Sequence, residues 1–148
     1  MRLLIWGAAV TAVLLWALPI FAYAPFASYE KPEEPKALTV QEWNTINATI
    51  YGVSEYEMNE TMRRESGFRP IQSGIPSSTG PNGREDSWCY AQIHLPSNPS
   101  VTRGQACDPS FASEFMAKEF SRGNQWKWAE WCKAFGFDSG VRKCEMYR

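Results

Sequence analysis

The chain has 148 residues, which is enough for one domain with tails but not for two. Hydrophobic residues make up 44% of it and aromatic residues 14%, so most of the chain can fold around a core and is not expected to be disordered. Fifteen basic residues against 16 acidic ones give a net charge of -1, which excludes the strongly basic surface that binding to nucleic acid requires.

The N-terminal segment has the residue order of an export signal. Arg2 precedes an uncharged run over residues 3–27, and a basic residue before an apolar stretch is typical of a secretory leader. Residues 22–24 (Ala-Tyr-Ala) resemble a cleavage site, but Pro25 obstructs cleavage there, and the run exceeds the about 20 residues that cross a bilayer. Residues 1–27 are therefore predicted to be either a signal peptide or a membrane anchor. In both cases the rest of the chain is exported to the periplasm or cell envelope.

Residues 28–38 mix proline with charge, which predicts an extended linker before a domain over residues 39–148. The four cysteines of this domain lack CxxC spacing and accompany a single histidine, His94, so we predict no metal site and no cofactor. We interpret His94 as a structural residue and expect a monomer. Export favours disulfides over free thiols, and four cysteines leave three pairings open.

Capping boxes predict the first two helices of the domain. Their residues are Thr39 with Glu42 and Ser54 with Glu57. The first helix is predicted to end at Gly52, and the second to cover residues 55–66 before Gly67. Helical spacing predicts an apolar face on the first helix, made by Val40, Trp43, Ile46 and Ile50.

Two further helices are expected in the C-terminal half. Asp108 and Pro109 are a typical helix start, and Asn124 is predicted to cap a helix that runs to Gly136. The apolar face of this last helix is expected to comprise Trp128, Trp131, Cys132 and Phe135. Glycines and prolines over residues 71–86 predict a long polar loop, and the apolar run 88–95 is consistent with a short strand or the start of a helix. The expected fold is a small, mainly α domain with at most a short β element, after an N-terminal apolar helix.

One carboxylate lies where the pattern of the second helix predicts burial. Met58, Met62 and Glu65 follow the spacing i, i+4, i+7, so they share one stripe of the helix. Burial and the negative end of the helix dipole both raise the pKa of a glutamate in the last turn, which makes Glu65 a candidate general acid. The alternative is a structural ion pair between Glu65 and one of the nearby arginines, which are Arg63, Arg64 and Arg69.

Two motifs carry a resemblance to a known family. The stretch 51–70 resembles the catalytic helix of the soluble lytic transglycosylases and goose-type lysozymes, and its matching residues are Glu65, Ser66, Gly67, Phe68 and Pro70. The stretch 86–96 is similar to the family's second motif at Gln92 and Ile93. The chain differs from the family at Cys89 and Tyr90, which stand where the family has Gly and Leu. It also lacks the Ala-Tyr-Asn-Ala-Gly motif, so Tyr90 is the nearest candidate for the family's assisting tyrosine.

The resemblance implies a lysozyme-like fold and cleavage of the β-1,4 linkage between N-acetylmuramic acid (MurNAc) and N-acetylglucosamine (GlcNAc) in peptidoglycan. Glu65 would act as acid and then as base, giving a 1,6-anhydro product without a second carboxylate. A hydrolase of the same bond would use Glu85 or Asp86 as that second group. The residues expected to hold the glycan are Ser66, Phe68, Tyr90 and Gln92, with Trp88 and Trp126 as stacking platforms. A non-catalytic peptidoglycan-binding or assembly module is the alternative from another class.

Overall fold

The computed structural model describes residues 36–138 and 140–148. The predicted leader and most of the linker lie outside these residues. Within the described part of the chain, no helix is long and apolar enough to cross a membrane. The described residues form a mainly helical domain with a small two-stranded sheet, as the sequence predicts.

Helices α1 (Val40–Tyr51) and α2 (Glu55–Ser66) have the predicted bounds. Each helix ends on a glycine in the left-handed conformation, with φ 64° at Gly52 and φ 62° at Gly67. Residues with a side chain rarely adopt this conformation. The capping box of α1 is complete. In α2, the Ser54 side chain accepts the backbone N–H of Glu57, but Glu57 itself accepts the indole Nε1–H of Trp131 at 2.9 Å. A tertiary hydrogen bond therefore replaces the second half of the predicted box.

The buried face of α1 differs from the predicted one. Ile46 and Ile50 are 39% and 66% exposed, and the buried residues of the helix are Val40, Asn44, Asn47 and Ala48. The two asparagines are buried because they bond to neighbouring helices: Asn44 Nδ2 donates to Asn59 Oδ1 at 2.9 Å, and Asn47 Nδ2 donates to Ser113 Oγ at 2.9 Å. Val40 is buried as predicted, but the predicted face is wrong at Ile46 and Ile50, because amides that bond to neighbouring helices occupy core positions, even though the buried Asn44 Oδ1 has no hydrogen-bond partner among the described residues.

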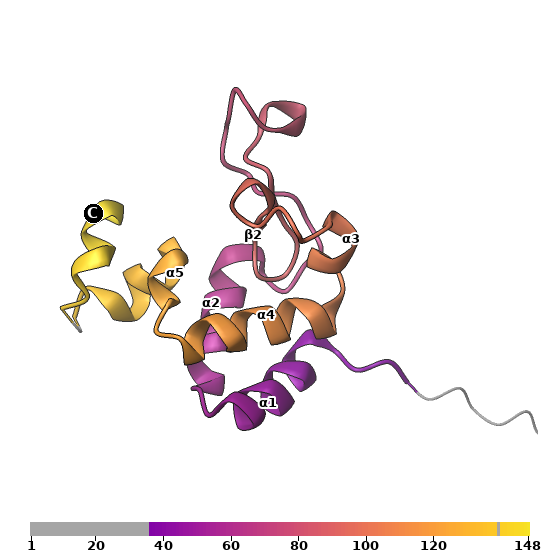
Figure 1. Ribbon diagram of the computed structural model, residues 1–148, viewed down its shortest axis with the longest axis vertical. Coiled ribbons are helices and arrows are strands. Elements are labelled where there is room, and N and C mark those ends of the chain that lie inside the picture. The colour runs from indigo at the N-terminus through magenta and orange to yellow at the C-terminus, as the bar shows by residue number, and fades with distance from the viewer. Residues whose placement is uncertain (1–35, 139) are drawn as a thin grey trace, which may run out of the picture. The chain divides into compact units, whose positions relative to one another are not determined.

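Helix α4 (Pro109–Ser121) begins as predicted, with the Asp108 side chain accepting the N–H of Phe111. It packs against α1, and α1 packs against α2 (Figure 1). A short helix that the sequence did not indicate, α3 (Arg103–Ala106), precedes it. The largest side chains in this core with no exposed surface are the methionines Met58, Met62 and Met116.

The long loop after α2 leads into an antiparallel pair of strands, β1 (Ser87–Trp88) and β2 (Ile93–His94). Two short 3-10 turns accompany them, η1 (Pro81–Gly83) and η2 (Leu95–Ser97). In Figure 1 the loop and the strands project from the helices as one lobe. The loop is ordered by backbone pairing between its two arms, which includes isolated bridges at Gln72↔Trp88 and Pro76↔Arg84. The structure therefore has the short β element that the sequence allowed.

The predicted single helix from Asn124 to Gly136 is wrong. In its place are three turns: η3 (Gln125–Lys127), α5 (Ala129–Trp131) and a π-helical turn, η4 (Cys132–Gly136). The Asn124 side chain caps none of them and donates instead to Glu119 Oε2 at 3.1 Å. A last turn, η5 (Arg142–Tyr147), completes the C-terminal lobe, which we define as residues 125–148.

Two disulfides, Cys89–Cys107 and Cys132–Cys144, use all four cysteines. The first joins the turn between the strands to the start of α4, and the second joins η4 to η5. Gly136 packs so closely against the second disulfide that a Cβ at this position would lie 2.3 Å from Cys144 Sγ, which makes glycine necessary there. Two disulfides are consistent with an oxidising compartment outside the cytoplasm.

We expect the double substitution of Cys89 and Cys107 by alanine to lower the free energy of unfolding by about 3 kcal/mol. The bond closes a loop with a sequence separation of 18, and its loss enlarges the conformational freedom of the unfolded chain. Urea denaturation of oxidised wild type and variant measures this difference. An unchanged unfolding midpoint would contradict a stabilising role for this bond.

Candidate active site

Glu65 lies in the last turn of α2, on the helix that carries the buried Met58 and Met62. Its side chain is partly buried, and the resulting desolvation raises its pKa from 4.5 to about 7. The backbone N–H of Glu130 donates to Glu65 Oε1 at 3.3 Å and acts in the opposite direction. The negative charges of Glu130 and Glu85 raise the pKa further, and the charge of Lys133 lowers it.

The arginines near Glu65 bond to other groups. Arg63 and Arg64 both pair with Glu60, at 2.7 and 2.6 Å, and these bonds lower the pKa of Glu60 to about 2. Arg69 Nε donates to the carbonyl of Ser66 at 3.1 Å. None of these three arginines pairs with Glu65, so the alternative of a structural ion pair is wrong. Two glutamates on one helix have pKa values shifted in opposite directions, because one is paired with guanidinium groups and the other is desolvated.

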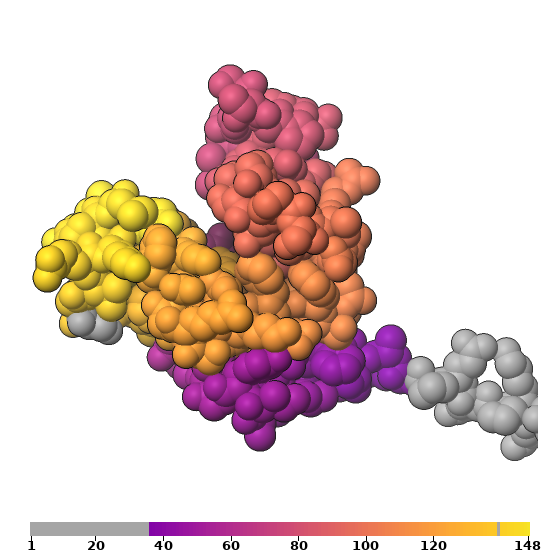
Figure 2. Space-filling model, viewed as in Figure 1, coloured from indigo at the N-terminus to yellow at the C-terminus, as the bar shows by residue number. Residues whose placement is uncertain are grey.

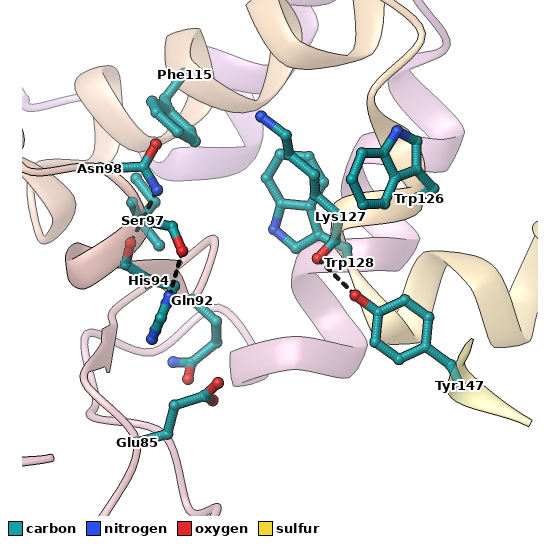
Figure 3. Close-up of a pocket in the computed structure, with 11 residues that line it drawn as sticks. Glu85, Gln92, His94, Ser97, Asn98, Phe115, Trp126, Lys127, Trp128 and Tyr147 are labelled. Carbon is teal, nitrogen blue, oxygen red and sulfur yellow. Dashed lines mark hydrogen bonds between the residues drawn. The ribbon is translucent and has the colours of Figure 1, made fainter. Parts of the chain in front are cut away.

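A pocket of about 330 Å³ lies between the loop lobe and the C-terminal lobe. Figure 2 shows the hollow between these two parts, and Figure 3 shows the side chains that face it. The lining residues come from the strands and the turn after them, from α4, and from the C-terminal lobe. They are Glu85, Gln92, Ile93, His94, Ser97, Asn98, Phe115, Trp126, Lys127, Trp128 and Tyr147.

Glu65 does not itself line this pocket, but its charge reaches two of the residues that do. Glu85 raises the pKa of Glu65. The pKa of Tyr147 is raised by burial and further by the charges of Glu65 and Glu85. Hydrogen bonds place Glu65 beside the pocket: its Oε1 accepts the backbone N–H of Glu130, close in sequence to the lining residue Trp128, and the adjacent Ser66 bonds to the carbonyl of Tyr90, close in sequence to the lining residue Gln92.

Gln92 and Ser66, two of the residues expected to hold the glycan, lie in different surroundings. Gln92 lines the pocket, with its backbone at φ 46°. Ser66 is buried, and its hydroxyl donates to the carbonyl oxygens of Tyr90 at 2.8 Å and Met62 at 3.2 Å. The Ser66 bonds tie the end of α2 to the turn between the strands. This arrangement favours a positioning role for Ser66 over contact with a substrate.

Several other candidates lie outside the lining of the pocket. Phe68 and Tyr90 pack against the hydrophobic core. The indole of Trp88 donates to Asp86 Oδ1 at 2.6 Å, and the guanidinium of Arg103 covers the Trp88 ring at 4.8 Å from its centre. Glu85 is thus the member of the Glu85 and Asp86 pair that the structure brings to the pocket, and Trp88 is less available for stacking.

The C-terminal lobe supplies lining residues that the sequence reasoning missed or only partly found. Trp126 lines the pocket, as a stacking platform would, and its ring is covered from one side by the ammonium of Lys143 at 4.4 Å. Tyr147 was not anticipated, because no local pattern connects the end of the chain to Glu65. His94 bonds to Ser97 Oγ at 2.8 Å, which agrees with a structural role, although it also lines the pocket.

The site residues suit acid–base chemistry. Among the described residues, no group of three or more His, Cys, Asp or Glu side chains is placed to hold a metal ion. The site combines a carboxyl group that exchanges its proton near neutral pH, a second carboxylate at Glu85, and aromatic rings. This set can protonate a leaving oxygen and bind a sugar.

We expect the stability of the protein to fall as the pH rises through the range in which Glu65 titrates. The pKa of Glu65 is about 7 in the folded chain and 4.5 when unperturbed, so the folded state binds more protons between these values. Its contribution is fully present below pH 4.5 and about 3 kcal/mol is lost above pH 7. Relative to wild type, Glu65→Gln should therefore become more stable across this range, measured by urea denaturation at pH 4.5 and 8.

The matched control for this experiment is Glu60→Gln on the same helix. The pKa of Glu60 is lowered to about 2, so its stabilising effect is already complete at pH 4.5 and above. Its stability relative to wild type should stay constant over the same pH range. Parallel pH profiles of wild type and Glu65→Gln would contradict the burial of an ionisable Glu65.

No protein-family model, curated protein or solved structure matches this chain. The chemistry of the site is therefore the basis on which a function is assigned.

Proposed function

We propose that the chain is a peptidoglycan lytic transglycosylase of the cell envelope, which cleaves the MurNAc–GlcNAc β-1,4 linkage with Glu65 as its acid and base. The observation that carries this proposal is the pKa of Glu65, about 7, at the end of α2 beside a pocket lined by aromatic and polar side chains. A general acid is most efficient when its pKa lies near the working pH.

The proposed reaction uses Glu65 twice. The protonated carboxyl donates its proton to the glycosidic oxygen, and the bond between that oxygen and C1 of MurNAc breaks. The carboxylate then removes the proton from the 6-hydroxyl of the same MurNAc, whose oxygen bonds to C1 and closes the 1,6-anhydro ring. The proton is back on Glu65 at the end, and no water is consumed.

The surroundings of Glu65 support both of its protonation states. Burial favours the neutral acid that the first step needs. The N–H of Glu130 on Oε1 and the charge of Lys133 favour the carboxylate that the second step needs. The opposing effects place the pKa near neutrality, so that the free energy required to move between the two states is small at physiological pH.

The pocket supports a glycan as the substrate. Trp126 and Phe115 supply aromatic surface of the kind on which sugar rings stack, and Gln92 and Asn98 add amides to the same lining (Figure 3). The two disulfides support export, since the peptidoglycan lies outside the cytoplasmic membrane.

A second candidate function, an inverting hydrolase of the same bond, is favoured by one observation. Glu85 lines the pocket and its charge acts on Glu65, so a second carboxylate is present where a hydrolase would need a base for its water. The transglycosylase reaction makes no chemical use of this group. The products and the effect of Glu85 substitution therefore distinguish the two reactions.

We expect Glu65→Gln to lose activity on peptidoglycan sacculi by a factor of about 10² to 10⁴, because glutamine cannot donate the proton. Zymography and turbidity clearing measure this loss, with Glu60→Gln as the control that keeps wild-type activity. Mass spectrometry of the released muropeptides should show 1,6-anhydro ends. Reducing ends would assign the hydrolase, and equal clearing by wild type and Glu65→Gln would leave only a non-catalytic binding module.

We expect kcat to fall about tenfold per pH unit above pH 7, because Glu65 must carry its proton to start the reaction. Glu85→Gln removes a negative charge that raises the pKa of Glu65, so it should move this fall to lower pH while activity at acidic pH is retained. Measurement of kcat from pH 5 to 9 tests both statements. Loss of activity in Glu85→Gln at every pH would support the hydrolase instead.

A further inference from the structure

The polar lining of the pocket includes a side-chain oxygen, Oε1 of Gln92, that is free to accept a hydrogen bond. Gln92 Nε2 donates to the carbonyl oxygens of Ile71 at 3.0 Å and Cys89 at 2.9 Å. Both partners are carbonyls, which only accept, so the orientation of the Gln92 amide is fixed by its bonds. In the described part of the chain no donor is bonded to Gln92 Oε1, and this oxygen remains as an acceptor.

Other side-chain donors of the pocket are also engaged within the protein. Asn98 Nδ2 donates to the His94 carbonyl at 2.8 Å, and Trp128 Nε1 donates to the Ala91 carbonyl at 2.7 Å. The Tyr147 hydroxyl donates to the Lys127 carbonyl at 3.4 Å. The Lys127 ammonium pairs with Glu119, and the indole nitrogen of Trp126 is buried. These bonds use the side-chain donors of Trp128 and Tyr147 and part of those of Asn98 and Lys127, the Trp126 indole N–H has no partner among the described residues, and Gln92 Oε1 remains free to accept.

Glu85 adds a negative charge to this set of acceptors. Its carboxylate accepts one hydrogen bond, from Ser73 Oγ at 3.3 Å, and no cation of the described residues forms an ion pair with it. Figure 3 shows the Glu85 carboxylate next to the Gln92 amide near the bottom of the view, whereas the Lys127 ammonium lies toward the top. The charge of Glu85 is strong enough to raise the pKa of both Glu65 and Tyr147.

We propose that this pocket binds a protonated primary amine of peptidoglycan in preference to an acetylated amine. An ammonium has three N–H donors and no acceptor, which matches the Glu85 carboxylate and Gln92 Oε1. An acetamido group carries no charge, so it lacks the ionic attraction to the Glu85 carboxylate that an ammonium has.

Two parts of peptidoglycan carry such an amine. One is a glucosamine unit that has lost its N-acetyl group, and the other is the side-chain amine of a diamino acid in the stem peptide. A primary amine is thus the ligand class of the proposed site. That this amine belongs to peptidoglycan rests on the proposed function. The preference for an amine is nonetheless a property of Glu85 and Gln92, and binding measures it without any turnover.

The test is isothermal titration of the full, oxidised chain at pH 6 with three ligands: a glucosamine tetramer, an N-acetylglucosamine tetramer, and a stem tripeptide that ends in a diamino acid. We expect the glucosamine tetramer or the tripeptide to bind about tenfold more tightly than the N-acetylated tetramer, a factor that corresponds to 1.4 kcal/mol. The amine ligand that binds more tightly identifies the source. Equal affinities, or tighter binding of the acetylated ligand, would overturn the proposal.

Two variants assign the preference to its residue. Glu85→Gln keeps the size of the side chain and removes its charge, so the preference for the amine ligand should disappear. Glu145→Gln makes the same chemical change at an exposed position of η5 outside the pocket lining, and it should keep the preference. A preference that survives Glu85→Gln would overturn the proposal. If this variant does not fold, the comparison of ligands on wild type decides by itself.

The outcomes separate this inference from the proposed function. Clearing of sacculi by wild type without a preference for amines would leave the transglycosylase standing and remove the inference. A preference for amines, abolished by Glu85→Gln, without cleavage of any glycan would keep the assignment of the pocket and remove the enzyme.

Discussion

The burial of one carboxyl group without a cationic partner is the constraint on which the site depends. Glu65 shares the apolar stripe of α2, and the arginines that could neutralise it bond to Glu60 and to a backbone carbonyl instead. Desolvation is then the largest effect on its pKa. Because a buried charge is costly, the protein favours the protonated form of Glu65 at acidic pH and gives up stability at higher pH. A general acid with this property is what cleavage of a glycosidic bond needs.

The rest of the fold places two walls around this group. The loop lobe brings Glu85 and Gln92, and its connection to the helices is secured by the Ser66 hydroxyl and the Cys89–Cys107 bond. The C-terminal lobe brings Trp126 and Tyr147, and the bond between Cys132 and Cys144 fixes its last turn against η4. Regular secondary structure is short in both walls, so disulfides and side-chain hydrogen bonds take over part of the role of helix packing.

In the proposed function, the electrostatics of the pocket would connect catalysis with recognition. The negative charge of Glu85 raises the pKa of Glu65, and the same charge makes the pocket attractive to a cationic ligand. A bound ammonium would offset the charge of Glu85 and so lower the pKa of Glu65 toward its ordinary value. If the proposals hold, ligand binding and the proton affinity of Glu65 would be linked through the Glu85 carboxylate, which a neutral residue at position 85 would not permit.

Local patterns in the sequence predicted the bounds of α1 and α2, the start of α4, and the position of Glu65 on the helix of Met58 and Met62, because each depends on residues within one turn or one helix face. They left the run 88–95 open between a short strand and the start of a helix. The family resemblance named Glu65 and Gln92 but extended to residues such as Phe68 and Tyr90 that pack in the core. Only the tertiary structure decided the buried face of α1, the pairing of the cysteines, the broken C-terminal helix, and the approach of Glu85 and Tyr147 to Glu65. These features depend on contacts between residues that are far apart in the chain, and hydrophobic periodicity carries no information about such contacts.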